Sequence, residues 1–128
     1  MNFKTDRERD EWAELFNKNK MLYSIALDVS SFSIREFGIM PLITEIQRSA
    51  EENEAIYGYR KVTVHMYWRG LDFRSWLYTT EQVKKIEEYI NNKYYYDKNR
   101  PSKKVCLAHN VGAGMHFHFQ THPRTELK

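Results

Sequence analysis

The chain has 128 residues, a length that suits a single domain, residues 1–128, with one modest hydrophobic core. Hydrophobic residues make up 41% of it, enough for that core, but they never form the run of about 18 apolar residues that a membrane-spanning helix needs. The net charge is +3 and no run of Lys and Arg is longer than two, so we expect no dedicated nucleic-acid surface.

The N-terminal residues and the single cysteine bear on where the protein is made and on whether it forms disulfides. Residues 1–12 are charged and lack the apolar segment of a secretory signal, so we expect synthesis in the cytoplasm without a signal peptide. Cys106 is the only cysteine, which excludes an intramolecular disulfide and a cysteine-based metal site. It lies in the apolar run 105–108, where we expect a buried strand residue.

The first half of the chain has mainly helical patterns. Residues 5–8 fit a capping box, and apolar residues then recur at helical spacing to about residue 20. The stretch 22–29 fits either a strand or a continued helix. Residues 32–55 predict a helix with a break at Gly38 or Pro41.

The second half has mainly strand patterns. A capping box at 79–82 predicts a helix to about Lys93, followed by a loop over 94–102. A glycine-rich turn is expected over 110–114. Period-2 alternation or short apolar runs predict strands over 62–67, 71–74, 105–108 and 115–120. This order predicts an α+β domain, a small antiparallel sheet with helices packed on one face.

The histidines are the most informative feature of the sequence. His65 is followed by Asp72 and, much later, by the triplet His116-Phe117-His118. Imidazole and carboxylate are the ligands that Zn²⁺ takes when thiolates are absent, and a catalytic zinc needs three of them. His116 and His118 share one face of the expected strand, with their Cα atoms about 6–7 Å apart. A lone histidine is usually an ordinary hydrogen-bonded residue, but this combination favours a metal site.

The same residues carry a family resemblance. The spacing His65-x₆-Asp72, followed by the C-terminal triplet, resembles the LAS zinc peptidases, which include lysostaphin-type enzymes, D-alanyl-D-alanine peptidases and the hedgehog domain. The closer likeness is to the D-alanyl-D-alanine carboxypeptidase and murein endopeptidase branch, with its phage L-alanyl-D-glutamate endolysins. Its specific motifs are confined to residues 65–74 and 114–120. The resemblance implies a hedgehog or D-Ala-D-Ala-peptidase-like fold.

The resemblance also implies a function. His65, Asp72 and His118 would bind Zn²⁺, and His116 would be the catalytic histidine. The reaction would be zinc-dependent hydrolysis of a peptide bond in cell-wall peptidoglycan, as in a phage lysis enzyme that reaches the wall after release from the cell. We expect a monomer whose partner is peptidoglycan or a peptide. A substrate carboxylate would be bound by Arg60, in an echo of the family's Gly-Tyr-Arg segment, or by Arg69 or Arg74.

Two departures from the family keep alternatives open. Residues 109–120 contain no acid, although many members carry a general base shortly before the last histidine, and Trp68 stands where the family has glycine. The domain could therefore be a non-catalytic relative that uses zinc for stability. A His-hydrophobic-His nuclease with a tyrosine nucleophile fits less well, because no tyrosine follows His118 and only Tyr89 matches its motif.

Overall fold

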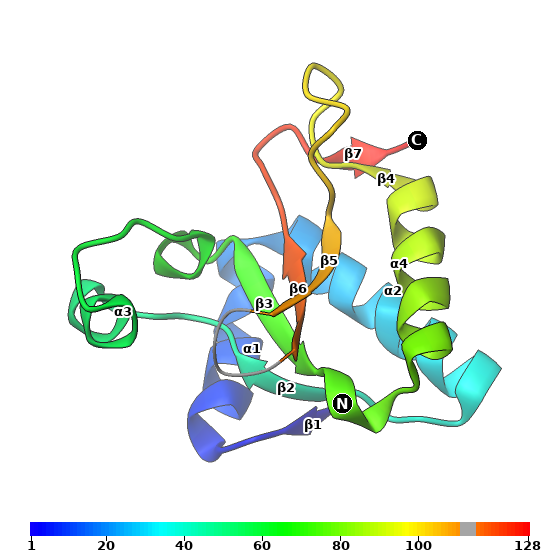
Figure 1. Ribbon diagram of the computed structural model, residues 1–128, viewed down its shortest axis with the longest axis horizontal. Coiled ribbons are helices and arrows are strands. Elements are labelled where there is room, and N and C mark those ends of the chain that lie inside the picture. Colours follow the sequence, from blue (N-terminus) through cyan, green and yellow to red (C-terminus); the bar gives the residue numbers. More distant parts are fainter. Residues whose placement is uncertain (111–114) are drawn as a thin grey trace.

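The computed structural model describes residues 1–110 and 115–128, with the side chains of 109, 110, 115 and 116 outside the description. Within these residues the chain is a mixed α/β structure with four α-helices, a five-stranded sheet and a separate two-stranded sheet (Figure 1). The helices are α1 (Asp6–Lys18), α2 (Lys20–Phe37), α3 (Ala50–Tyr57) and α4 (Thr80–Lys93). The strands are β1 (Asn2–Phe3), β2 (Leu42–Glu45), β3 (Gly70–Arg74), β4 (Tyr94–Tyr95), β5 (Cys106–Asn110), β6 (Met115–Gln120) and β7 (Glu126–Leu127).

The main sheet is mixed, not fully antiparallel as the sequence suggested. Its strand order is β1-β2-β3-β6-β5; β1 pairs with β2 in parallel, and the other neighbours are antiparallel. The difference comes from β1, a strand too short to leave a period-2 pattern in the sequence. β4 and β7 pair apart from this sheet, and β4 lies within the stretch 94–102 that was expected to be a loop.

One face of the sheet packs against helices. Residues of β3 and β6 alternate, so that Leu71, Phe73, Phe117 and Phe119 point into the core while Asp72 belongs to the other face. Helices α1, α2 and α4 contribute the apolar partners of this core. The helical members of the buried cluster are Leu15, Leu22, Ile25, Ala26, Val29, Ile86 and Ile90. In Figure 1, α3 lies apart from these three helices, at the left edge of the view.

The capping signals in the sequence give the correct helix starts. α4 begins after Thr79, whose side chain accepts from the backbone of Gln82 in a complete capping box. α1 begins after Thr5, as expected, although the Thr5 hydroxyl donates to the Glu8 carboxylate instead of capping a backbone amide. The ambiguous stretch 22–29 is helical, within α2.

The expected break at Gly38 in the helix predicted over 32–55 is confirmed, but the helix does not resume until Ala50. α2 ends at Phe37 because Gly38 takes a left-handed conformation, with φ 68°, and β2 then follows. Ile43 of β2 is fully buried in the core, so its apolar character serves a strand. A separate capping box at Ser49 begins α3, which ends at Gly58.

The expected strand over 62–67 is also wrong. Val64–Tyr67 form a 3₁₀ turn, η1, and Val62 is 65% exposed. Asn53 of α3 explains the difference, because its side chain bonds the backbone carbonyl of Lys61 and the hydroxyl of Thr63 and so holds this segment against α3. The expected turn over 110–114 lies mostly outside the described residues. Among the residues described, no helix combines the length and apolar content that a membrane crossing requires.

Candidate metal site

Three side chains from separate elements meet on the sheet face that points away from the helical core. His65 comes from η1, Asp72 from β3 and His118 from β6, where Asp72 and His118 are direct cross-strand partners. One ligand atom from each lies within 4.8 Å of the other two. His118 Nδ1 is 2.7 Å from Asp72 Oδ1, and His65 Nε2 is 3.5 Å from Asp72 Oδ2. All three residues are at most 7% exposed.

A second hydrogen bond turns each imidazole toward this group. Nδ1 of His65 donates to the backbone carbonyl of Ile46 at 2.9 Å, which leaves Nε2 facing Asp72. Nε2 of His118 lies 3.3 Å from the Oε1 atom of Gln120. The amide of Gln120 is itself oriented, because its Nε2 donates to the Lys104 carbonyl at 2.9 Å. Outer contacts of this kind orient metal-binding histidines in proteins.

The electrostatics of the group favour a negative carboxylate beside positive charge. Burial on its own would raise the pKa of Asp72, but hydrogen bonds from His118 and His65 outweigh it and hold that pKa far below its usual range. Burial on its own would lower the pKa of His65, yet the hydrogen bond and the charge of Asp72 raise it. Without a metal ion, the Asp72 carboxylate therefore favours a proton on His65, and a bound cation would take the place of that proton.

The donor set fits a metal ion. Two imidazoles and one carboxylate are ligands of the type and number found in catalytic zinc sites. Zinc holds nitrogen at about 2.0–2.1 Å, so two ligand atoms on one ion are at most about 4.2 Å apart. The widest separation here is within 4.8 Å, and a small rotation of a ring closes that gap. His65, Asp72 and His118 could thus hold a metal ion.

The backbone between His65 and Asp72 is shaped by two unusual positions. Trp68 has φ 57°, and it is the only non-glycine residue of the described chain with positive φ. It ends η1 and redirects the chain into β3. At Gly70, an added Cβ would lie 2.5 Å from a methyl of Val64 and 3.2 Å from the His118 ring. Only glycine allows β3 to approach the site so closely.

The three arginines expected to bind substrate have different positions. His65, Asp72 and His118 are called the metal group below. Arg60 is exposed in the loop after α3, and none of the contacts described joins it to the metal group. Arg69 has a structural role, because its guanidinium donates to the Thr121 carbonyl at 2.8 Å and to the Tyr96 hydroxyl at 3.0 Å. Arg74 lies two residues beyond Asp72 on the same strand face, stacked on Trp76 at 4.9 Å.

His116, the predicted catalytic residue, is described only by its backbone. It occupies β6 opposite Arg74 of β3 and His109 of β5. Its side chain lies outside the described part of the chain, so its role stays a prediction.

Sequence reasoning missed a charged pair next to the metal group. Arg48 is only 7% exposed, and its Nε lies 3.3 Å from Oε1 of Glu45. Glu45 is the cross-strand partner of Asp72, and the charge of Arg48 opposes protonation of His65. Asn53 also accepts from Arg48, at 2.9 Å. A buried arginine is rare enough to suggest function, but the sequence places this one inside an expected helix.

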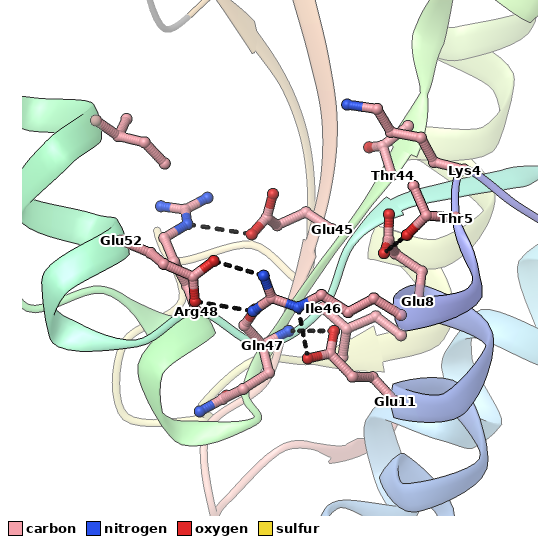
Figure 2. Close-up of a pocket in the computed structure, with 12 residues that line it drawn as sticks. Lys4, Thr5, Glu8, Glu11, Thr44, Glu45, Ile46, Gln47, Arg48 and Glu52 are labelled. Carbon is pink, nitrogen blue, oxygen red and sulfur yellow. Dashed lines mark hydrogen bonds and ion pairs between the residues drawn. The ribbon is translucent and has the colours of Figure 1, made fainter.

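Arg48 and Glu45 line a pocket of about 320 Å³ between α1, β2 and α3. Figure 2 shows Arg48 and Glu45 pointing toward one another, with Glu52 beside Arg48 and Glu11 farther away at α1. Within the described residues, Oε1 of Gln47 is a buried acceptor without a hydrogen-bond partner.

Comparisons with known proteins identify no relative. The chain matches no protein-family model, and neither the curated proteins nor the solved structures with which it was compared include a match. The family resemblance of residues 65–74 and 114–120 therefore stays a prediction from the sequence.

Replacing Gln120 with leucine should weaken metal binding by about 10–100-fold, the usual cost of losing an outer contact to a metal-binding histidine. The leucine cannot accept from His118 Nε2, so that ring is no longer held with Nδ1 toward Asp72. Gln120→Glu is the matched control, because it keeps an acceptor at the same position. Competition titration with a chromogenic chelator measures both affinities, and equal affinities would show that Gln120 does not orient the ring.

Proposed function

We propose that this protein is a zinc-dependent hydrolase that cleaves a peptide bond in bacterial cell-wall peptidoglycan. The observation that supports this most directly is the convergence of His65, Asp72 and His118, with both imidazoles oriented by outer acceptors. The left-handed backbone at Trp68 adds support. It stands where the resembling family has glycine, the residue that adopts this conformation most easily.

Zinc is the metal that this donor set favours. Imidazole and carboxylate suit zinc, and the tightly packed group is too poor in oxygen ligands for calcium or magnesium. Bound zinc would supply an activated water and polarise a scissile carbonyl. The residues of the chain then have to bind the substrate, orient it and move protons.

Substrate binding is assigned to the pocket beside the metal group. Arg48 presents a mostly buried guanidinium there, and such a group binds carboxylates well. A peptide that carries a free carboxylate, like the stems of peptidoglycan, would supply such a carboxylate. This replaces Arg60 as the preferred substrate-binding arginine.

Proton transfer is assigned to Glu45 or His116. The segment 109–120 has no acid, but the fold brings Glu45 of β2 opposite Asp72. The pairing lies at a register irregularity between Ile43 and Glu45, which puts Glu45 next to Asp72 across the two strands. Its ion pair with Arg48 fixes its carboxylate at the pocket wall.

Digestion of purified peptidoglycan by the zinc-loaded protein tests this proposal, with released fragments identified by mass spectrometry. We expect new amino termini in stem or cross-link peptides. Glu45→Gln should lower kcat by about 10²–10⁴-fold if Glu45 moves the proton, with zinc affinity unchanged. His116→Ala is the parallel test of the other candidate. A zinc-loaded protein that cleaves no peptidoglycan or D-amino-acid peptide would contradict the proposal.

A non-catalytic zinc-stabilised domain is the second candidate. The low exposure of the three ligands, at most 7%, favours it, because structural metals are enclosed. Zinc-dependent thermal stabilisation without cleavage would identify it. The nuclease alternative has little support, because the hydroxyl of Tyr89 donates to Asp28 at 2.8 Å on the helical side of the sheet.

A further inference from the structure

Positive charge is concentrated in the last part of the chain. Residues 93–128 contain seven Lys and Arg residues and two acids, a net charge of +5 that exceeds the +3 of the whole chain. The remaining residues are therefore net acidic. Positive charge that is concentrated in one segment indicates a surface for an anionic partner more strongly than evenly spread charge does.

The fold gathers much of this charge at one end of the molecule. β4 and β7 pair there, and the Lys128 amide donates to the Lys93 carbonyl at 2.9 Å. In Figure 1 this end lies at the top, where the loop after β4 meets β7. A small pocket of about 70 Å³ opens between these segments, and Lys103, Lys104 and Lys128 line it together with Tyr95.

The acids near this pocket are already paired with other cations. Asp97 accepts from Arg100 at 3.1 Å and from Arg124 at 3.0 Å. Glu126 lies 2.9 Å from the ammonium group of Lys98. Among the ion pairs of the described residues, none involves the lysines that line the pocket. Three ammonium groups around one concave surface thus lack a described carboxylate.

The aromatic residue of the pocket indicates what kind of anion would bind. The ring of Tyr95 faces Lys128 at 5.0 Å and Lys98 at 6.0 Å. These two ammonium groups lie over the ring, so a nucleic-acid base could stack on that face only by displacing them. Recognition by charge alone fits a polymer that carries repeated anions on a flexible backbone.

We propose that the pocket between β4, β7 and the loop 98–104 binds the phosphate groups of a linear phosphate polymer, without reading any base. Lys103, Lys104 and Lys128 would contact one phosphate group or adjacent groups. The exposed guanidinium of Arg124 and ammonium of Lys98 lie beyond the pocket and would attract further groups of the same chain. This site does not depend on the metal or on the proposed hydrolysis.

Binding of fluorescently labelled inorganic polyphosphate, followed by anisotropy, tests the proposal. The triple variant Lys103→Ala, Lys104→Ala, Lys128→Ala should lose at least about tenfold in affinity at low salt. The slope of log affinity against log salt should fall by about 2, from about 0.7 for each of three lost contacts. The matched control, Lys20→Ala, Lys84→Ala, Lys85→Ala, removes the same charge from exposed positions elsewhere and should bind nearly as the parent does.

Two results would overturn the proposal. Equal loss in both triple variants would mean that net charge alone attracts the polymer. Tighter binding of a single-stranded oligonucleotide than of polyphosphate with the same number of phosphates would mean that bases are recognised. Asp72→Asn, which removes a metal ligand, should keep full polyphosphate affinity, so this test stands apart from that of the hydrolase. Melting temperatures of all variants establish that they are folded.

Discussion

Asp72→Asn should abolish metal binding by this protein. Asp72 contacts both histidines of the group, so the substitution removes one ligand and the acceptor that positions the other two. The loss in affinity should exceed the roughly 10–100-fold cost of losing an outer contact. The amide leaves most of the shape of the side chain unchanged, so packing against β6 is largely kept.

Zinc titrations of thermal unfolding measure this effect. With free zinc about 100-fold above Kd, binding adds about 2.7 kcal/mol to the free energy of unfolding of the parent. For a domain of this size that raises Tm by on the order of 10 °C. Asp72→Asn should show almost no rise. Asp10→Asn, the same change at an exposed position of α1, should respond like the parent. A parent without a zinc shift or bound zinc would eliminate the metal site.

Local signals in the sequence were sufficient for several elements of the fold. The capping box at Thr79 and the alternation around Phe117 predict α4 and β6 with nearly correct bounds. In both cases the local pattern and the tertiary environment agree, because the apolar face is also the buried face. Alternation also separates His118 from the core, but the choice of His65, Asp72 and His118 as candidate ligands depended on the family resemblance, because His65 lies in a turn and not in the expected strand.

Other elements depend on contacts that the sequence does not display. The segment 62–67 alternates like a strand, but Asn53 binds it to α3, and a short apolar run does not reveal such a partner. The residues of β2 were assigned to an expected helix. The sequence therefore did not indicate that Glu45 pairs with Asp72 across the strands or that Arg48 is buried. The acid and the arginine next to the metal group could therefore be found only from the fold.

The metal-free protein should lose stability as pH rises above about 6.5, the pKa of histidine in an unfolded chain, and zinc should oppose that loss. In the unfolded chain the pKa of a histidine is about 6.5. Burial works against it, but the hydrogen bond and charge of Asp72 raise the pKa of His65 in the folded state. The stabilisation is therefore complete below the unfolded pKa and disappears as pH rises through the folded pKa. The pKa of Asp72 is lowered, so its own contribution is lost only in acid.

Zinc changes the sign of this dependence because its ligands must be deprotonated. The stabilisation that zinc adds should grow as pH rises above about 6.5, because protons then compete less for His65. Calorimetric melting in chelator and in zinc, over a series of pH values on both sides of that value, measures how stability depends on pH without and with the metal. The pKa of His122 is lowered by burial and by the charges of Arg100 and Arg124. This histidine therefore makes stability rise with pH, opposite to the effect of His65 in chelator.

Subtracting the Asp72→Asn profile from that of the parent separates the two histidines. His122 lies outside the metal group and should contribute equally to both proteins. The difference should therefore fall with rising pH in chelator. A difference that is flat in chelator would show that Asp72 does not favour protonation of His65. A zinc effect that is independent of pH would show that the metal binds at groups other than these histidines.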